Sequence, residues 1–85
     1  MKTIFIGALP FRTTARTIQD LVKSYGPKEG TLEVHADWVN PTFEPYAVVT
    51  LRDPERAIEE LDGLKIGAYH LRVHMAAEKK ELKNG

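Results

Sequence analysis

The sequence predicts an α+β domain in the order β-α-β-β-α-β, with a four-stranded antiparallel sheet and two helices on one of its faces. Apolar residues recur at every second position in some segments, as in strands, and at every third or fourth position in others, as in helices. Proline and glycine separate these segments. The length of 85 residues is enough for one small core and too short for two domains.

The first strand and the first helix are predicted over residues 2–9 and 14–25. The strand segment is largely apolar and ends at Pro10, which cannot donate a hydrogen bond to a neighbouring strand. Thr14 is a suitable N-cap residue, and Gly26 is a suitable residue to end the helix. The apolar residues that share one face of this helix are Ile18, Leu21, Val22 and Tyr25.

Three more strands and a second helix follow. Residues 32–38 and 70–75 alternate between apolar and polar, and residues 46–51 are rich in β-branched types, so each segment predicts a strand. Asp53 followed by Pro54 predicts a helix start, with the carboxylate as N-cap and proline in the first turn. The apolar face of this helix is formed by Ala57, Ile58 and Leu61.

Right-handed crossover connections would place both helices on the same face of the sheet, with the strands in the order 4-1-3-2. This is the ferredoxin-like arrangement. The opposite face would then remain uncovered. Since small domains seldom leave a large apolar surface without a use, we expect this open face to bind something.

Phe5 and Tyr46 are the aromatic residues that strand alternation places on the open face. Ile4 and Ile6, which flank Phe5 in the sequence, should face the helices. Tyr46 and Val48 should both point outward, as Phe5 does. The two rings lie on adjacent central strands of the predicted order. Such a pair can stack nucleobases, which contributes about 1–3 kcal/mol per base.

At these residues the chain resembles the RNA recognition motif family over residues 2–77. Residues 4–9, with the sequence Ile-Phe-Ile-Gly-Ala-Leu, are similar to the family's short hexapeptide. Phe5 stands at the stacking position of that motif, whereas Ala8 stands where asparagine is usual. The resemblance implies a ferredoxin-like RNA-binding domain over residues 1–77, followed by a polar C-terminal tail over residues 78–85.

The family's longer octapeptide aligns with residues 44–51 without a gap. The matching positions are Tyr46, Ala47 and Val49, and the departures are Glu44, Pro45, Val48 and Leu51. Glu44 replaces a cation that seeks phosphate, Pro45 replaces a flexible glycine, and Val48 replaces a third outward aromatic residue. These departures keep open the alternative that the domain binds a protein partner and that RNA is secondary.

The formal net charge is zero, so the composition as a whole does not attract polyanions. The charges are unevenly distributed, however. Residues 1–30 and 64–85 are basic, whereas residues 31–63 carry eight acidic residues against two arginines. The first and fourth strands come from the basic parts and are expected to be neighbours, so that side of the sheet should favour phosphates.

Five residues on that side are candidate RNA contacts beyond the rings. Lys2, Lys79 and Lys80 could meet phosphates. Arg72 and His74 lie on one face of the fourth strand, where they could bond to bases, sugars or the backbone. Outward polar residues on an edge strand can also be merely solvated, and the tail lysines can belong to a solvated segment.

Other classes of function have little support in the sequence. The chain has no cysteine, which excludes disulfides and thiolate metal sites, and its three histidines are not expected to converge, so we predict no metal and no cofactor. Ser24 has no convincing histidine and carboxylate partners, so we expect no enzyme activity. No long apolar run predicts a membrane segment or a signal peptide, and we expect a cytoplasmic monomer.

Two functions remain open at this point. The first is a module that binds single-stranded RNA, with single-stranded DNA as a variant, by stacking bases on Phe5 and Tyr46. The alternative is a protein-interaction domain of the same fold with little or no nucleic-acid binding. Trp38 and Phe43 flank the predicted loop between the second and third strands, where they could contact RNA or, as we favour slightly, cover one end of the core.

Overall fold

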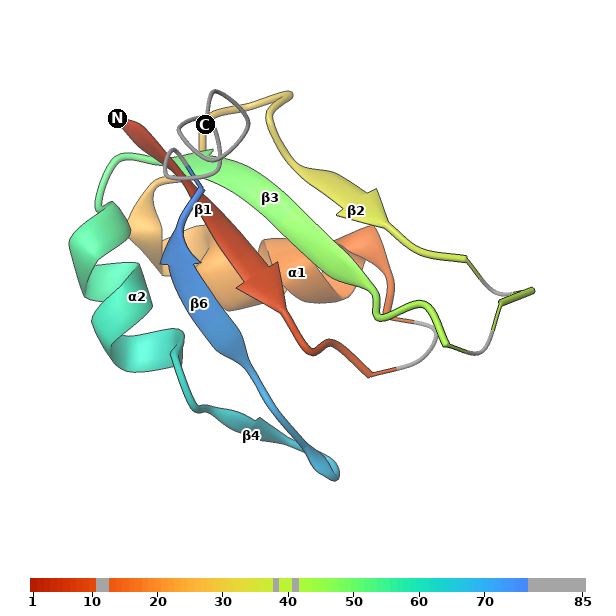
Figure 1. Ribbon diagram of the computed structural model, residues 1–85. Helices are drawn as coiled ribbons and strands as arrows, with labels where there is room; N and C mark the ends of the chain where they lie inside the picture. The colour runs from red at the N-terminus through yellow and green to blue at the C-terminus, as the bar shows by residue number, and fades with distance from the viewer. Residues whose placement is uncertain (11–12, 38, 41, 77–85) are drawn as a thin grey trace, which may run out of the picture.

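The computed structural model describes residues 1–10, 13–37, 39–40 and 42–76. The chain folds into two layers, a sheet and a pair of helices behind it (Figure 1). In chain order the elements are β1 (Lys2–Gly7), α1 (Ala15–Val22), the 3-10 helix η1 (Lys23–Tyr25), β2 (Glu33–His35), β3 (Tyr46–Leu51), α2 (Pro54–Leu61), β4 (Lys65–Ile66), β5 (Tyr69–His70) and β6 (Arg72–Met75).

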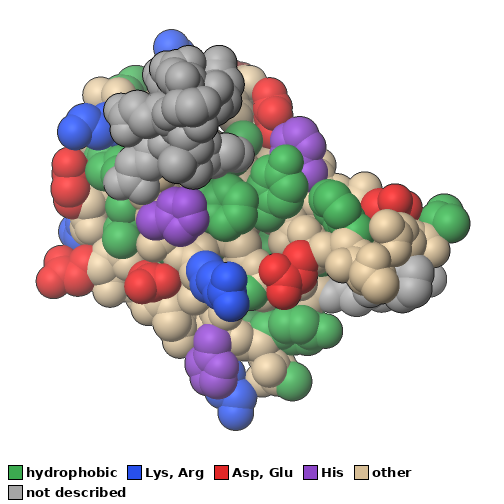
Figure 2. Space-filling view, viewed as in Figure 1, with side chains coloured by type: hydrophobic (Ala, Val, Ile, Leu, Met, Phe, Trp, Pro, Cys, Tyr) green, Lys and Arg blue, Asp and Glu red, His purple; other side chains and the backbone are tan. Residues whose placement is uncertain are grey.

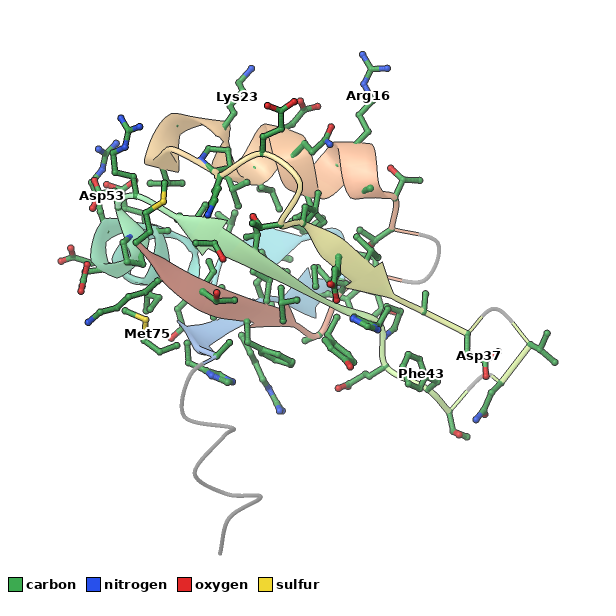
Figure 3. The ribbon with its side chains drawn as sticks, turned by 90° about the horizontal axis from the view of Figure 1, so that it is seen from above. Arg16, Lys23, Asp37, Phe43, Asp53 and Met75 are labelled. Carbon is green, nitrogen blue, oxygen red and sulfur yellow. The ribbon has the colours of Figure 1, made fainter. Side chains whose placement is uncertain are left out.

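The main sheet has the predicted topology. Its strands lie in the order β2-β3-β1-β6, and all three pairings are antiparallel. Both helices lie on one face of this sheet (Figure 1). Arg16 of α1 and Lys23 of η1 project away from the sheet on the helix side, whereas Phe43 lies toward the opposite side of the sheet (Figure 3). The second layer therefore covers one sheet face and leaves the other without helices.

The core lies between the sheet and the helices, as the alternation predicted. Ile4 and Ile6 of β1 are completely buried. They pack with inward residues of β3 and β6 and with the apolar faces of the helices, namely Ala47, Val49, Leu51, Leu71, Val73, Ile18, Val22, Ala57 and Leu61. Because every second residue of the central strands enters this core, the residues between them must face the other way.

The helices begin and end close to where the sequence predicts, but the predicted capping hydrogen bond of the Asp53 side chain does not form. The Thr14 hydroxyl accepts a hydrogen bond from the Thr17 backbone N–H at 3.3 Å, which caps α1. Gly26 ends η1 at a φ of 71°, a conformation that favours glycine. Asp53 occupies the N-cap position of α2, but its side chain makes no capping hydrogen bond. Its carboxylate instead accepts from the Arg56 guanidinium at 3.4 Å.

Two elements differ from the sequence-based prediction. Strand β2 is limited to residues 33–35, whereas the alternation predicted residues 32–38. The Asp37 carboxylate accepts from the backbone N–H groups of Val39 and Asn40, so the chain turns there instead of continuing the ladder. The small hairpin of β4 and β5 was not predicted, and Gly67 at its turn has a φ of 61°.

Within the described residues, no helix is long and apolar enough to cross a membrane. The predicted tail over residues 78–85 lies outside the described residues.

A partly buried hydrogen bond joins η1 to α2. The Tyr25 ring is only 6% exposed, and its hydroxyl donates to the Glu60 carboxylate at 2.6 Å. The Arg56 guanidinium lies 5.2 Å from the centre of the same ring and also bonds to Glu60. The hydrogen bond from Tyr25 is the main cause that lowers the pKa of Glu60, and the same bond raises the pKa of Tyr25.

The residue after β1 has an unusual backbone conformation. Ala8 has a φ of 58°, and it is the one residue other than glycine with a positive φ in the part of the chain that the structure describes. This conformation brings Cβ close to the following carbonyl oxygen in an L-residue, whereas asparagine and glycine adopt it more readily. Ala8 therefore adds strain at the position where the family usually has asparagine.

We expect Tyr25→Phe to weaken the acid sensitivity of folding. Because the pKa of Glu60 is lower in the folded state, the ionised carboxylate stabilises the fold above its unfolded-state pKa of about 4.3, and this stability is lost as pH falls. The loss between about pH 5 and pH 3 should be smaller in the variant, as measured by urea denaturation. Equal pH profiles for the two proteins would contradict this role of Tyr25.

We also expect Ala8→Gly to raise the free energy of unfolding by about 1 kcal/mol, because glycine relieves the strain at positive φ. Ala36→Gly is the matched control, since Ala36 is exposed and lacks a positive φ. It should leave stability unchanged or lower it. A denaturation midpoint for Ala8→Gly below that of the unchanged protein would disprove the strain.

Candidate nucleic-acid interface

The sheet face opposite the helices carries two rows of side chains that cross all four strands. The strand register places His35, Tyr46, Gly7 and Arg72 in one row, and Glu33, Val48, Phe5 and His74 in the other. In the space-filling view of this face, hydrophobic side chains gather over β1 and β3 with a histidine on each side (Figure 2). The open face therefore has an aromatic centre.

Phe5 and Tyr46 meet at this centre because the Phe5 ring leans along its own strand over Gly7. A Cβ atom on Gly7 would lie only 2.5 Å from Cε1 of Phe5, so a larger residue there would push the ring away. The ring centres of Phe5 and Tyr46 are 5.2 Å apart, with an angle of 25° between the planes. This offset stacking is a favourable arrangement of two aromatic rings.

Imidazole rings extend the stack at both ends. His74 on β6 stacks on Phe5 at 4.7 Å between ring centres and an angle of 18°. His35 on β2 stacks on Tyr46 at 4.7 Å and 13°. Each of the four strands thus contributes one ring to a continuous series, which takes two residues from each of the two register rows. We call this series the ring row: His35, Tyr46, Phe5 and His74. Phe5 and Tyr46 are half-buried.

His35 is the member of the ring row that the sequence did not predict. Its place on the far edge strand was expected, but its contact with Tyr46 depends on the pairing of β2 with β3, which sets His35 directly opposite Tyr46. Its Nε2 lies 3.2 Å from the Glu33 carboxylate. In the sequence, His35 and Glu33 are simply two outward polar residues of an edge strand, and this pattern does not predict stacking on Tyr46.

Phe43 also adjoins the ring row. Its ring centre is 6.3 Å from that of Tyr46, and the residue is 37% exposed. The sequence slightly favours a place at the end of the core for Trp38 and Phe43. Phe43 instead lies beside the outward-facing Tyr46, and Trp38 lies outside the described residues.

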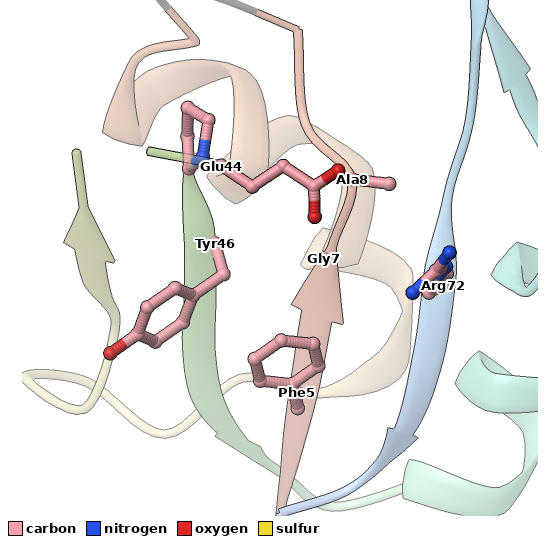
Figure 4. Close-up of a pocket in the computed structure, with 7 residues that line it drawn as sticks. Phe5, Gly7, Ala8, Glu44, Tyr46 and Arg72 are labelled. Atoms are coloured by element: carbon pink, nitrogen blue, oxygen red, sulfur yellow. The ribbon is translucent and has the colours of Figure 1, made fainter. Parts of the chain in front are cut away.

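A pocket opens at one end of the Phe5 ring (Figure 4). Its volume is about 320 Å³, and its lining consists of Phe5, Gly7, Ala8, Glu44, Pro45, Tyr46 and Arg72. The side chain of Glu44 extends from the start of β3 toward Ala8, and Arg72 faces the pocket from β6 (Figure 4). Aromatic surface and two opposite charges thus meet in one depression.

Of the other residues predicted to contact RNA, some lie on the open face and others do not. Val48 lies half-buried on the open face, opposite Phe5 in the register, and His74 belongs to the ring row. Lys2 shares the strand face of Ile4 and Ile6, and its ammonium lies 3.9 Å from Glu55 on α2. The position of Lys2 therefore gives no support to a contact on the open face. Lys79 and Lys80 lie outside the described residues.

No metal site is found in the described part of the chain, where no three His, Asp or Glu side chains lie close enough to hold an ion. His35 and His74 stand at opposite edges of the sheet. The open face presents flat rings, the exposed Arg72 guanidinium and the carboxylates of Glu33 and Glu44.

Comparisons with known proteins all point to the same protein family. The sequence matches the RNA recognition motif over residues 4–72. The serine/arginine-rich splicing factor SR34B of Arabidopsis thaliana is 37% identical to this chain over 79 residues, which cover 88% of the chain and 27% of the splicing factor. The chain thus spans about a quarter of the length of that relative.

Solved structures of the same fold agree. RNA recognition domains 1 and 2 of Sex-lethal from Drosophila melanogaster match with a TM-score of 0.75 and 26% identity, covering 89% of this chain and 50% of that one. The RNA recognition motif of Rna15, solved with bound RNA (GU), matches with a TM-score of 0.68 and 20% identity, covering 98% and 97%. This chain therefore belongs to the RNA recognition motif family, a family of RNA-binding domains.

Proposed function

We propose that the domain binds single-stranded RNA by adding nucleobases to the ring row on its open sheet face. The observation that carries this proposal is the stacked pair of Phe5 and Tyr46, extended by one imidazole on each side. Bases of single-stranded RNA are flat rings whose faces are available for stacking. They can join an offset stack whatever their identity, which suits the centre of the row to general rather than base-specific binding.

The comparisons support RNA as the ligand. The chain belongs to the RNA recognition motif family, and the Rna15 domain of the same fold has been solved with bound RNA. The Arabidopsis relative is named as a splicing factor, so a role in binding RNA fits this domain. We accordingly propose a non-catalytic binding module.

The charges favour modest affinity. The net charge is zero, and Arg72 is the described cation that lines the pocket beside Phe5. Glu33 and Glu44 bring negative charge to the β2 and β3 side of the same face. Few phosphates can then be neutralised, and we expect a dissociation constant on the order of micromolar at physiological salt.

Several expectations from the sequence stay predictions. They are phosphate contacts by Lys79 and Lys80, binding of single-stranded DNA, a protein-docking role, a cytoplasmic location and a monomeric state. Binding of single-stranded DNA, protein docking and the monomeric state can be examined with the same purified protein that the binding experiments require, and the location with the labelled protein in cells.

Removal of the two central rings should abolish most of the affinity. Each ring contributes about 1–3 kcal/mol per stacked base, which corresponds to about 5- to 150-fold in affinity per ring. The Phe5→Ala, Tyr46→Ala double variant should therefore bind a fluorescent single-stranded RNA at least tenfold more weakly by anisotropy. Tyr69→Ala is the matched control, because Tyr69 is an exposed tyrosine of the separate β4–β5 hairpin.

This control should bind like the unchanged protein, and circular dichroism should show that both variants are folded. Unchanged affinity in the folded double variant would exclude stacking on these rings. A purified protein without bound nucleic acid and with a stoichiometric protein partner would favour the docking role instead.

Binding should depend only weakly on salt. Each phosphate contact with single-stranded RNA adds about −0.7 to the slope of log K against log salt concentration. With two or three contacts we expect a slope of about −2 or shallower. Anisotropy titrations between 50 and 200 mM salt, about the range in which such slopes are measured, would test this. A slope steeper than about −4 would mean that phosphate attraction, rather than stacking, dominates.

A further inference from the structure

The pocket beside Phe5 differs from the rest of the open face because two groups of opposite charge enter it from different strands. Glu44 precedes β3, and Arg72 begins β6, on the other side of β1. The pocket measures about 320 Å³, which lies within the range of sites that hold small flat ligands. Gly7 and Ala8 line it beside the two rings with little side-chain bulk.

Both charged groups are able to form hydrogen bonds with a ligand. In the part of the chain that the structure describes, the Glu44 carboxylate and the Arg72 guanidinium have no hydrogen bond or ion pair with another residue. An ionised carboxylate only accepts hydrogen bonds and can accept two side by side, whereas a guanidinium only donates. A ligand that satisfies both must present paired donors on one edge and acceptors on another.

Among the four RNA bases, guanine meets this demand. Its Watson–Crick edge presents two adjacent donors, N1–H and the N2 amino group, and its other edge presents the acceptors O6 and N7. Adenine, cytosine and uracil each place at least one acceptor beside the donor on the pairing edge, where it would face the carboxylate. In Figure 4 the Glu44 side chain extends toward Ala8, and Arg72 stands on β6 on the other side of β1, so the two charged groups border the pocket from different strands.

The carboxylate also discriminates by repulsion. Glu44 stands where the family motif has a lysine or arginine, so its carboxylate repels phosphate where the motif's cation would attract it. The carboxylate also forms no hydrogen bond with a base that presents no donors to it. Glu44 is exposed in the free domain, and a base that covers its carboxylate without donating to it would remove that carboxylate from water uncompensated, so a wrong base is penalised as well as unrewarded. The same substitution that weakens general binding can thus sharpen selection at this one position.

We propose that this pocket selects a guanine, with the Glu44 carboxylate accepting from N1–H and the N2 amino group and the Arg72 guanidinium donating to O6 or N7. The guanidinium has five N–H donors, so contact with the base leaves others for the RNA backbone. This inference rests on the proposed stacking function, because the base must lie on Phe5 for its edges to reach the two side chains.

The test compares fluorescent RNA pentamers that differ only at the centre, UUGUU, UUAUU, UUCUU, UUUUU and UUIUU, at one salt concentration. UUGUU should bind about tenfold more tightly than UUAUU, which is within the usual discrimination of a paired contact. Inosine keeps N1–H and lacks the 2-amino group, so UUIUU should bind with intermediate affinity. The ratio of two affinities removes effects common to all pentamers.

Glu44→Gln should reduce the preference for UUGUU over UUAUU to about threefold or less, because the amide has one acceptor oxygen and offers a donor beside it. Glu33→Gln is the matched control. Glu33 is an exposed acid on the same face, outside the pocket. Its substitution removes the same charge and should leave the guanine preference intact.

The outcomes separate the two proposals. Equal binding of all pentamers, or a guanine preference that survives Glu44→Gln, would overturn guanine selection and leave base stacking standing. Equal loss of preference in Glu44→Gln and Glu33→Gln would also overturn it, since only general charge would then matter. Absence of binding to every pentamer would instead overturn the proposed function itself.

Discussion

The constraint on which the rest of this molecule depends is the alternation of side chains in strands that are covered on one face only. Both helices lie on the same side of the main sheet, so Ile4, Ile6 and their neighbours fill the core. Phe5 then has to face the other way, as does Tyr46 on the adjacent strand. The aromatic centre of the interface is therefore a direct consequence of how the core is filled.

Much of this could be predicted from the sequence, because strand alternation and helix caps are local signals. The order of the main sheet, the burial of Ile4 and the outward position of Phe5 all follow from such signals. Lys2 shares its strand face with Ile4 and Ile6, and this alternation places its ammonium 3.9 Å from Glu55 of α2. The stacking of His35 on Tyr46 could not be predicted, because it depends on the register between two strands joined by a long loop.

The composition of the interface explains how a chain of zero net charge can belong to an RNA-binding family. Stacking on rings needs no net charge, whereas phosphate attraction does. Glu44 and Arg72 are far apart in the sequence and meet at one pocket only because β1 lies between β3 and β6. In the arrangement that we propose, the rings would supply general affinity, and the pair of opposite charges would supply selection among bases.

An NMR titration of backbone amide shifts with a short single-stranded RNA tests the central claim most directly, because it reports which surface meets the ligand. If the ring row binds the bases, the amides that shift first will be those of β1, β3 and β6 around Phe5, Tyr46 and His74. Shifts confined to the outer faces of α1 and α2, with the sheet amides unmoved, would contradict the account.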